Sequence, residues 1–179
     1  ITTTLIAGPS NLTSPKGIKV KKITSADEML SAVKKSLPAD LAVCVAAVTD
    51  FKPEVKSKNK IKKENMNLNS IKFVKNNDIL EYICKHNKYR PRLVAGFSAE
   101  TENVTKNSIN KMKRKHCDII FANNVSQKDI GFNSDYNKVS VIDKKGNVKI
   151  IPKNKKSFIA NKIAEILLDK LLIDDRNIN

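Results

Sequence analysis

The sequence LAVCVAAVTDFKPEVKSKNKIKK, residues Leu41 to Lys63, changes character at Asp50. Its first part, Leu41 to Val48, is an uninterrupted apolar run rich in valine, which predicts a short strand buried on both faces of a sheet. Open α/β sheets bind their ligands in the crevice outside the carboxyl ends of the strands. Asp50 comes directly after this strand, and it is therefore a candidate ligand-binding residue.

The second part of the stretch is strongly basic. Residues 52–63 contain six lysines and few apolar side chains, so this segment is too polar to pack in a core and suits contact with phosphate groups. We interpret residues 52–69 as a flexible lid over a polyphosphate. A simpler alternative stays open, because an acid after a strand often only forms a turn or a helix cap, and a lysine run is usually solvated surface.

Length and composition indicate one cytoplasmic domain. A chain of 179 residues is large enough for a single core. No apolar run approaches the ~20 residues that cross a bilayer, and the first residues do not resemble a signal peptide, so we expect no membrane partner. Cys44, Cys84 and Cys117 are odd in number and lie in apolar segments, which predicts buried free thiols. The two histidines form no metal-ligand spacing.

The net charge of +16 suggests nucleic acid as one possible partner. However, almost all of the 34 lysines and arginines are lysines, and aromatic residues make up only 5% of the chain. Arginine forks and stacked aromatics are the usual means of recognising nucleic acids. We therefore expect no nucleic-acid partner, and we expect the charge to attract anionic small molecules.

Strand and helix patterns alternate along the chain. Ser25 and Glu28 form a capping box that predicts an amphipathic helix after it. Residues 138–152 predict a β-hairpin. Further strands are expected at 1–7, 71–74, 93–97 and 118–122, and further helices at 77–84, 102–115 and 157–171. The last helix should bury Phe158, Ile159, Ile163, Ile166, Leu167 and Leu171. This order predicts an α/β fold, a three-layer Rossmann-like doubly wound sheet with an added β-hairpin near the C-terminus.

Two further features of the pattern point to a ligand. Lys111 and Lys115 are four residues apart on a predicted helix, so both ammonium groups should emerge on one face, where an anion between them would relieve their repulsion. A solvated lysine face is the alternative. Gly96 places bare backbone beside Phe97, which would let a flat group approach closely. No G-x-G-x-x-G or Walker loop is present to bind phosphates through backbone amides.

Several short blocks, in order, resemble phosphopantothenoylcysteine synthetase, the carboxyl-terminal domain of the bifunctional coenzyme A biosynthesis flavoprotein. They are AAVTD at 46–50, KIKK at 60–63, VKNNDI at 74–79, GFSAET at 96–101, ANNVS at 122–126 and GFNSD at 131–135. The resemblance implies a ligase that joins 4'-phosphopantothenate to L-cysteine with CTP and Mg2+. The phosphopantothenate carboxylate attacks the α-phosphate of CTP, and the amine of cysteine then displaces CMP from the acyl cytidylate.

The resemblance also implies site residues. The nucleotide would be bound by Cys44, Val45, Ala46, Asp50, Lys60, Asn77, Asp78, Ile79, Leu80, Phe97, Lys111 and Lys115. Lys60 would be catalytic and, with Lys111 and Lys115, would neutralise the triphosphate. Asp50 would bind either the ribose or the metal. Phosphopantothenate would contact Gly8, Asn11 and Asn124, for which turn formation is an equally good explanation.

The resemblance carries three further expectations. The chain should lack the first strand, first helix and glycine-rich segment of the family, and it should bind no FMN because the decarboxylase half is absent. Residues 122–151 should form the interface of a homodimer. The alternative function is a nucleotide- or nucleic-acid-binding Rossmann-like module without catalysis, and an NAD-binding domain is disfavoured by the missing glycine pattern.

Overall fold

The computed structural model describes residues 1–55, 57, 71–86, 88–126, 129–130 and 134–176, and side chains within these ranges up to residue 173. The chain divides into two compact units. One comprises residues 1–36 and 46–79, and the other comprises residues 37–45 and 80–179.

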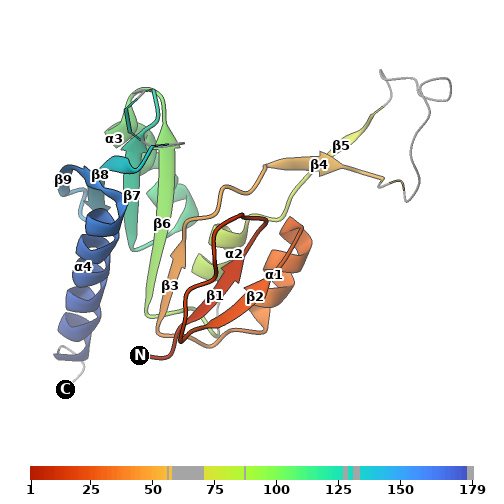
Figure 1. Ribbon diagram of the computed structural model, residues 1–179, viewed down its shortest axis with the longest axis horizontal. Helices are drawn as coiled ribbons and strands as arrows, with labels where there is room; N and C mark the ends of the chain where they lie inside the picture. Colours follow the sequence, from red (N-terminus) through yellow and green to blue (C-terminus); the bar gives the residue numbers. More distant parts are fainter. Residues whose placement is uncertain (56, 58–70, 87, 127–128, 131–133, 177–179) are drawn as a thin grey trace. The chain divides into compact units, whose positions relative to one another are not determined.

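The unit of residues 37–45 and 80–179 contains a five-stranded sheet (Figure 1). Its strands, in spatial order, are β3 (Leu41–Cys44), β6 (Leu93–Glu100), β7 (Ile119–Asn124), β8 (Tyr136–Asp143) and β9 (Val148–Lys155). β3, β6 and β7 are parallel, whereas β8 and β9 are added antiparallel. The strands β8 and β9 confirm the predicted hairpin.

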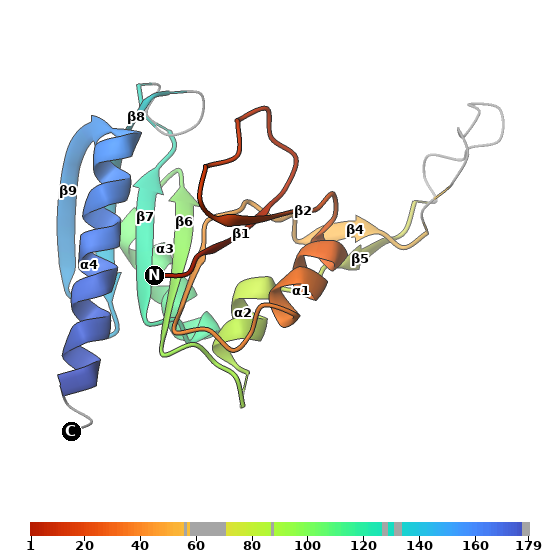
Figure 2. The ribbon, with the colours of Figure 1, turned by 60° about the horizontal axis from the view of Figure 1, so that its bottom comes forward.

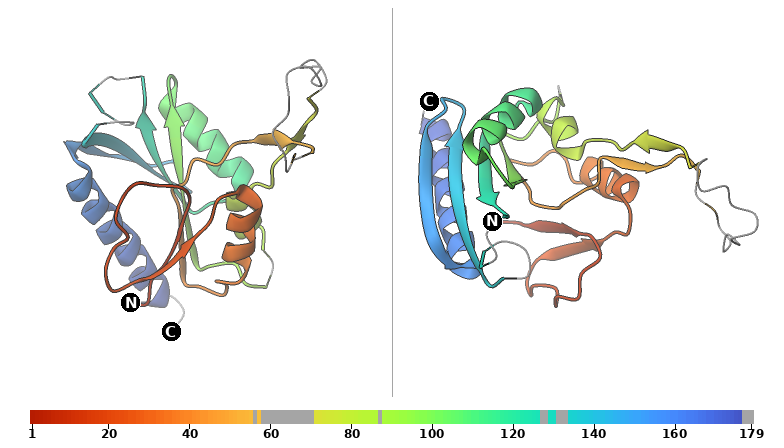
Figure 3. Two further views of the ribbon diagram at one scale, coloured as in Figure 1. Left: turned by 45° about the vertical axis from the view of Figure 1, so that its right-hand side comes forward. Right: turned by 90° about the horizontal axis from the view of Figure 1, so that it is seen from above.

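Helices cover both faces of this sheet (Figure 3). Alternate residues of a strand point to opposite faces. Ile119 and Phe121 pack in one core with Ile159 and Ile163 of the helix α4 (Lys156–Arg176). Ile120, with no exposed surface, points to the other face, where α3 (Val104–Lys115) packs on β6 and β7. The predicted three-layer α/β sheet is therefore confirmed.

The other unit contains two small strand pairs and a helix (Figure 2). β1 (Thr4–Ala7) pairs in parallel with β2 (Lys19–Lys22), and β4 (Phe51–Pro53) pairs antiparallel with β5 (Phe73–Lys75). The helix α1 covers Ala26–Lys34. The predicted lid thus begins inside β4.

The capping box of α1 is formed. The backbone N–H of Glu28 donates to Ser25 Oγ at 3.3 Å, and the Glu28 carboxylate accepts from the backbone N–H of Thr24 at 2.7 Å. The Glu28 side chain therefore bonds Thr24, the residue before the N-cap, and not Ser25 itself. The bond to Ser25 satisfies an N–H group that the first turn of a helix leaves without a partner.

Three predictions about burial are wrong. Cys44 is only partly buried, whereas Cys84 and Cys117 are buried as predicted. The apolar run from Leu41 forms a strand only to Cys44, and Val43 and Val45 are 41% and 60% exposed. β3 lies at the edge of the five-stranded sheet, so it is not enclosed as a central strand would be. Phe158 is 41% exposed although Ile159 beside it is buried. Residues four apart from Ile159 along α4 form the buried stripe, and Phe158 lies outside that stripe.

Candidate functional site

The carboxyl ends of β3, β6 and β7 meet at one edge of the five-stranded sheet, because these strands are parallel. Cys44 lies opposite Gly96 in the register, and Asn124 lies opposite Glu100. This edge is where open α/β sheets bind ligands. It brings together Cys44, Phe97 and Asn124, three of the predicted site residues.

Lys111 reaches this part of the sheet from α3. Its ammonium group donates to the backbone carbonyl of Phe97 at 2.8 Å. The Phe97 ring lies 5.3 Å from the Phe121 ring, between centroids, in a tilted arrangement. The structure therefore joins two predicted nucleotide-binding residues by a direct hydrogen bond.

Glu100 is a residue of this edge that the sequence analysis did not single out. Its carboxylate accepts from Ser98 Oγ at 2.5 Å and from Asn107 Nδ2 at 3.3 Å. Asn107 lies one turn before Lys111, so Glu100 fixes the face of α3 that carries this lysine. Its position inside the block GFSAET was the available signal.

Lys115 has a different partner from Lys111. It is only 7% exposed, and its ammonium group lies 2.9 Å from the carboxylate of Glu81 in α2 (Ile79–Cys84). Glu81 also binds Lys85 at 2.6 Å. A solvated lysine face, the simpler alternative, does not describe Lys115. Glu81 was missed, although its spacing of four residues from Lys85 is visible in the sequence.

The two lysines change the acidity of Glu81. Hydrogen bonds from Lys85 and then from Lys115 favour the charged carboxylate, and they lower the pKa of Glu81 from 4.5 to about 2. At neutral pH the group is therefore ionised, and Lys115 has a partner of opposite charge inside the unit.

The space beside Gly96 is filled by α2. A Cβ atom added at Gly96 would lie 2.8 Å from Leu80 Cδ2 and 3.1 Å from Ile120 Cδ1. The prediction that a flat ligand approaches this backbone is therefore wrong, because the Leu80 side chain occupies the position. Glycine is required there for the helix to pack on the sheet.

In the other unit, Asn76 organises the segment around Asp50. The backbone N–H of Asn76 donates to the carbonyl of Asp50 at 2.7 Å, and its side-chain amide donates to the carbonyl of Thr49 at 2.9 Å. Asn76 is 9% exposed. It precedes Asn77 and Asp78, so it holds two predicted nucleotide-binding segments together.

The remaining predicted residues are distributed as follows. Ala46, Asn77, Asp78 and Ile79 belong to the unit that contains Asp50, as do the half-buried Gly8 and the exposed Asn11. Val45 belongs to the unit with Lys111. Asn124 accepts from the backbone N–H and the hydroxyl of Ser126 at 2.9 and 2.7 Å, which is turn formation. Lys60 lies outside the described residues.

Among the residues with described placement, no three His, Cys, Asp or Glu side chains gather as a metal-binding cluster. Mg2+ rarely needs such a cluster in nucleotide enzymes, because substrate phosphates with one or two carboxylates hold it. Asp50 and Asp78 are the carboxylates among the predicted nucleotide-binding residues. None of the described helices is both long enough and apolar enough to pass through a bilayer.

Comparison with known proteins supports the resemblance. The chain is 39% identical over 166 residues to the coenzyme A biosynthesis bifunctional protein CoaBC of Borreliella burgdorferi, covering 92% of this chain and 41% of that protein. It is 35% identical over 179 residues to CoaBC of Escherichia coli, covering 97% of this chain and 43% of that protein. The chain thus spans about two-fifths of the length of these curated relatives.

Solved structures show the same fold. The C-terminal domain of a CoaBC protein superposes with a TM-score of 0.74 at 25% identity, covering 97% of this chain and 77% of that one. A DNA/pantothenate metabolism flavoprotein from Streptococcus pneumoniae superposes with a TM-score of 0.66 at 16% identity, covering 95% of this chain and 78% of that one. The family described as the DNA/pantothenate metabolism flavoprotein C-terminal domain matches residues 1–171. The chain belongs to this family.

Proposed function

We propose that this chain is the synthetase domain of coenzyme A biosynthesis and joins 4'-phosphopantothenate to L-cysteine with CTP. The observation that carries the proposal is the 39% identity to a CoaBC protein over 92% of the chain. A Cab2 variant with the same fold, 14% identical, was solved in complex with phosphopantothenate-cysteine. That compound contains both halves of the proposed product.

The arrangement around Lys111 supports a phosphate site. Its ammonium group lies at the carboxyl half of β6 and donates to a backbone carbonyl, a bond that an incoming phosphate oxygen can replace. A cation placed there stabilises the charge that develops on leaving pyrophosphate. Lys60 would add a second cation from the lid, and exclusion of water by the lid would protect the acyl cytidylate from hydrolysis.

Asp50 and Asp78 suit the sugar or the metal side of the nucleotide. Asn76 fixes the backbone of Asp50 through a hydrogen bond to its carbonyl. Mg2+, bound mainly by the triphosphate, would supply charge neutralisation. Phe97, with the backbone at Ala46, would contact the cytosine. Gly8, Asn11 and Asn124 remain the proposed contacts of phosphopantothenate.

Pyrophosphate release tests this function. We expect release with CTP, Mg2+ and 4'-phosphopantothenate, and formation of the amide and CMP when L-cysteine is added. ATP in place of CTP should support much less release, and CTP with Mg2+ should raise the melting temperature more than ATP or short DNA. Equal stabilisation by CTP and DNA, without pyrophosphate release, would favour the non-catalytic binding module.

A homodimer through residues 122–151 is part of the proposal. Val148 and Ile150 of β9 are 44% and 55% exposed, and Tyr136 of β8 is 42% exposed. Exposed apolar side chains on neighbouring strands are typical of a protein interface. A partner copy would cover them.

A further inference from the structure

Cys84 and Cys117 form a pair of thiols that the proposed reaction does not use. Cys84 is the last residue of α2, and Cys117 lies between α3 and β7. They are 4% and 1% exposed, and each thiol shifts the pKa of the other, which indicates that the two side chains are neighbours. The residues come from separate segments of the chain, so the fold and not the local sequence brings them together.

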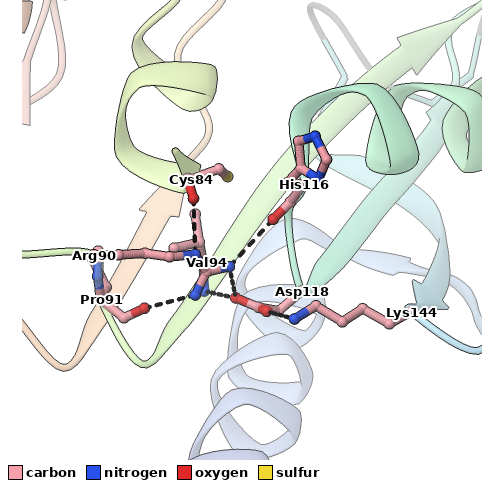
Figure 4. Close-up of polar contacts among 7 residues, drawn as sticks. All are labelled: Cys84, Arg90, Pro91, Val94, His116, Asp118 and Lys144. Atoms are coloured by element: carbon pink, nitrogen blue, oxygen red, sulfur yellow. Dashed lines mark hydrogen bonds and ion pairs between the residues drawn. The ribbon is translucent and has the colours of Figure 1, made fainter. Parts of the chain in front are cut away.

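A single guanidinium group holds the backbones on which these thiols sit (Figure 4). Arg90 Nε donates to the carbonyl of Cys84 at 2.9 Å, and an Arg90 terminal nitrogen donates to the carbonyl of His116 at 3.2 Å. The same terminal nitrogen lies 2.9 Å from the carboxylate of Asp118. Because the donors of arginine form a rigid planar fork, the end of α2 and the residue before Cys117 are held close.

One residue of this pair borders a hollow on the surface. An open hollow of ≈ 600 Å³ is lined by Cys84, Lys85, His86, Arg90 and His116. Its lining side chains are basic or neutral, so it favours anionic molecules over cationic ones. Cys84 is the member of the thiol pair that lines this hollow.

We propose that Cys84 and Cys117 form a disulfide by exchange with a small anionic disulfide of the glutathione disulfide type. The Cys84 sulfur attacks one sulfur of the reagent, which breaks its S–S bond and releases one thiol. The Cys117 sulfur then attacks Cys84 Sγ and releases the second thiol. The protein loses two protons and two electrons, and these reduce the reagent to two thiols.

Access to the hollow assigns the order of attack, because Cys84 lines it whereas Cys117 is 1% exposed. The neighbouring Cys117, together with burial, raises the pKa of the Cys84 thiol. The first attack needs the Cys84 thiolate, so the exchange should become faster as the pH rises.

This disulfide would link the ends of α2 and α3. The same two helices are already joined by an ion pair between Glu81 of α2 and Lys115, the last residue of α3. The modification would therefore limit separation of the two helices. It depends on neither CTP nor ligase activity.

Peptide mapping tests the proposal. The reduced full chain is incubated with glutathione disulfide, free thiols are blocked with N-ethylmaleimide, and the protein is digested without reductant for mass spectrometry. We expect a cross-linked peptide pair that contains Cys84 and Cys117, formed faster at pH 8.5 than at pH 7. Dithiothreitol should remove it. The same treatment in denaturant gives the unselective reference, in which Cys44 also pairs.

Variants distinguish selective pairing from chance. Cys44→Ala should keep the cross-link, and Cys84→Ala and Cys117→Ala should each abolish it. Two results with native protein would overturn the proposal. In one, Cys84 and Cys117 carry only separate glutathione groups; in the other, both are alkylated because they stayed free thiols. Cross-links to Cys44 as abundant as in denaturant would overturn it as well. These measurements on the unmodified sequence decide the question even if an alanine variant does not fold.

Discussion

In the proposed reaction, the ammonium group of Lys111 would neutralise charge on the leaving pyrophosphate. It lies on α3 and donates to the Phe97 carbonyl at 2.8 Å. We predict that Lys111→Gln lowers kcat/KM for pyrophosphate release about 100- to 1000-fold, as expected when one group that stabilises transition-state charge is removed.

The matched control is Lys113→Gln. Lys113 is an exposed lysine of the same helix. The Lys113→Gln variant should have a kcat/KM within about twofold of the parent value, because exposed charges far from a ligand are screened. If both variants retain full activity, Lys111 has no part in the reaction.

Glu81 predicts how stability depends on pH. Its pKa is about 2 in the folded chain and 4.5 ordinarily, so its pairing stabilises the fold fully above pH 4.5. That contribution is lost as the pH falls from 4.5 towards 2. In urea unfolding, the parent should therefore have a larger free energy of unfolding than Glu81→Gln at pH 6, and this difference should be smaller at pH 3. The same difference at both pH values would show that the ionised pair does not contribute to stability.

At the scale of elements, the contact of α2 with the sheet depends on Gly96. A methyl group at this position would lie 2.8 Å from Leu80 Cδ2, so Gly96→Ala should destabilise the fold by about 1–3 kcal/mol through overpacking. Urea denaturation measures the loss. Adding Leu80→Ala should recover part of it.

Gly8→Ala is the control for this substitution. The nearest atom to a Cβ at Gly8 is Ile23 Cδ1, at 4.0 Å, which is ordinary contact. Its unfolding midpoint should match that of the parent. A similar loss in both variants would mean that backbone freedom, and not packing against Leu80, explains the effect.

The elements were predictable where their signal is local. The capping box at Ser25, the final helix and the hairpin around Gly146 each depend on neighbouring residues, and all three are present. Burial of Val43 was not predictable, because it depends on which strand lies at the edge of the sheet. Strand order is a property of the whole fold.

The candidate site was partly predictable for a related reason. Spacing on a helix indicated that Lys111 and Lys115 share a side of α3, but their partners come from β6 and α2. The buried pairing of Lys115 with Glu81 joins residues far apart in sequence. No periodic pattern encodes such a pair, whereas Glu100 and Asn76 lay inside or beside blocks already identified.

At the scale of the whole molecule, the proposed homodimer rests on β8 and β9. We predict that Ile150→Lys shifts the protein from dimer to monomer in light scattering coupled to size-exclusion chromatography, because a charge would be buried without a partner. Ile150 is 55% exposed in the single chain. Leu172→Lys, at a side chain of α4 that is 56% exposed, should remain dimeric. Dimers in both variants would place the interface elsewhere.

Asp118 connects strands of the five-stranded sheet at one end only. Its carboxylate accepts from the Val94 backbone N–H at 2.6 Å, lies 2.9 Å from Arg90 and also pairs with Lys144 after β8 (Figure 4). The beginnings of β6 and β7 are thereby fastened to the end of β8. Deuterium uptake should consequently be slowest at that margin and should increase along β6 towards Glu100, so that thermal opening starts at the edge where the proposed substrates would bind.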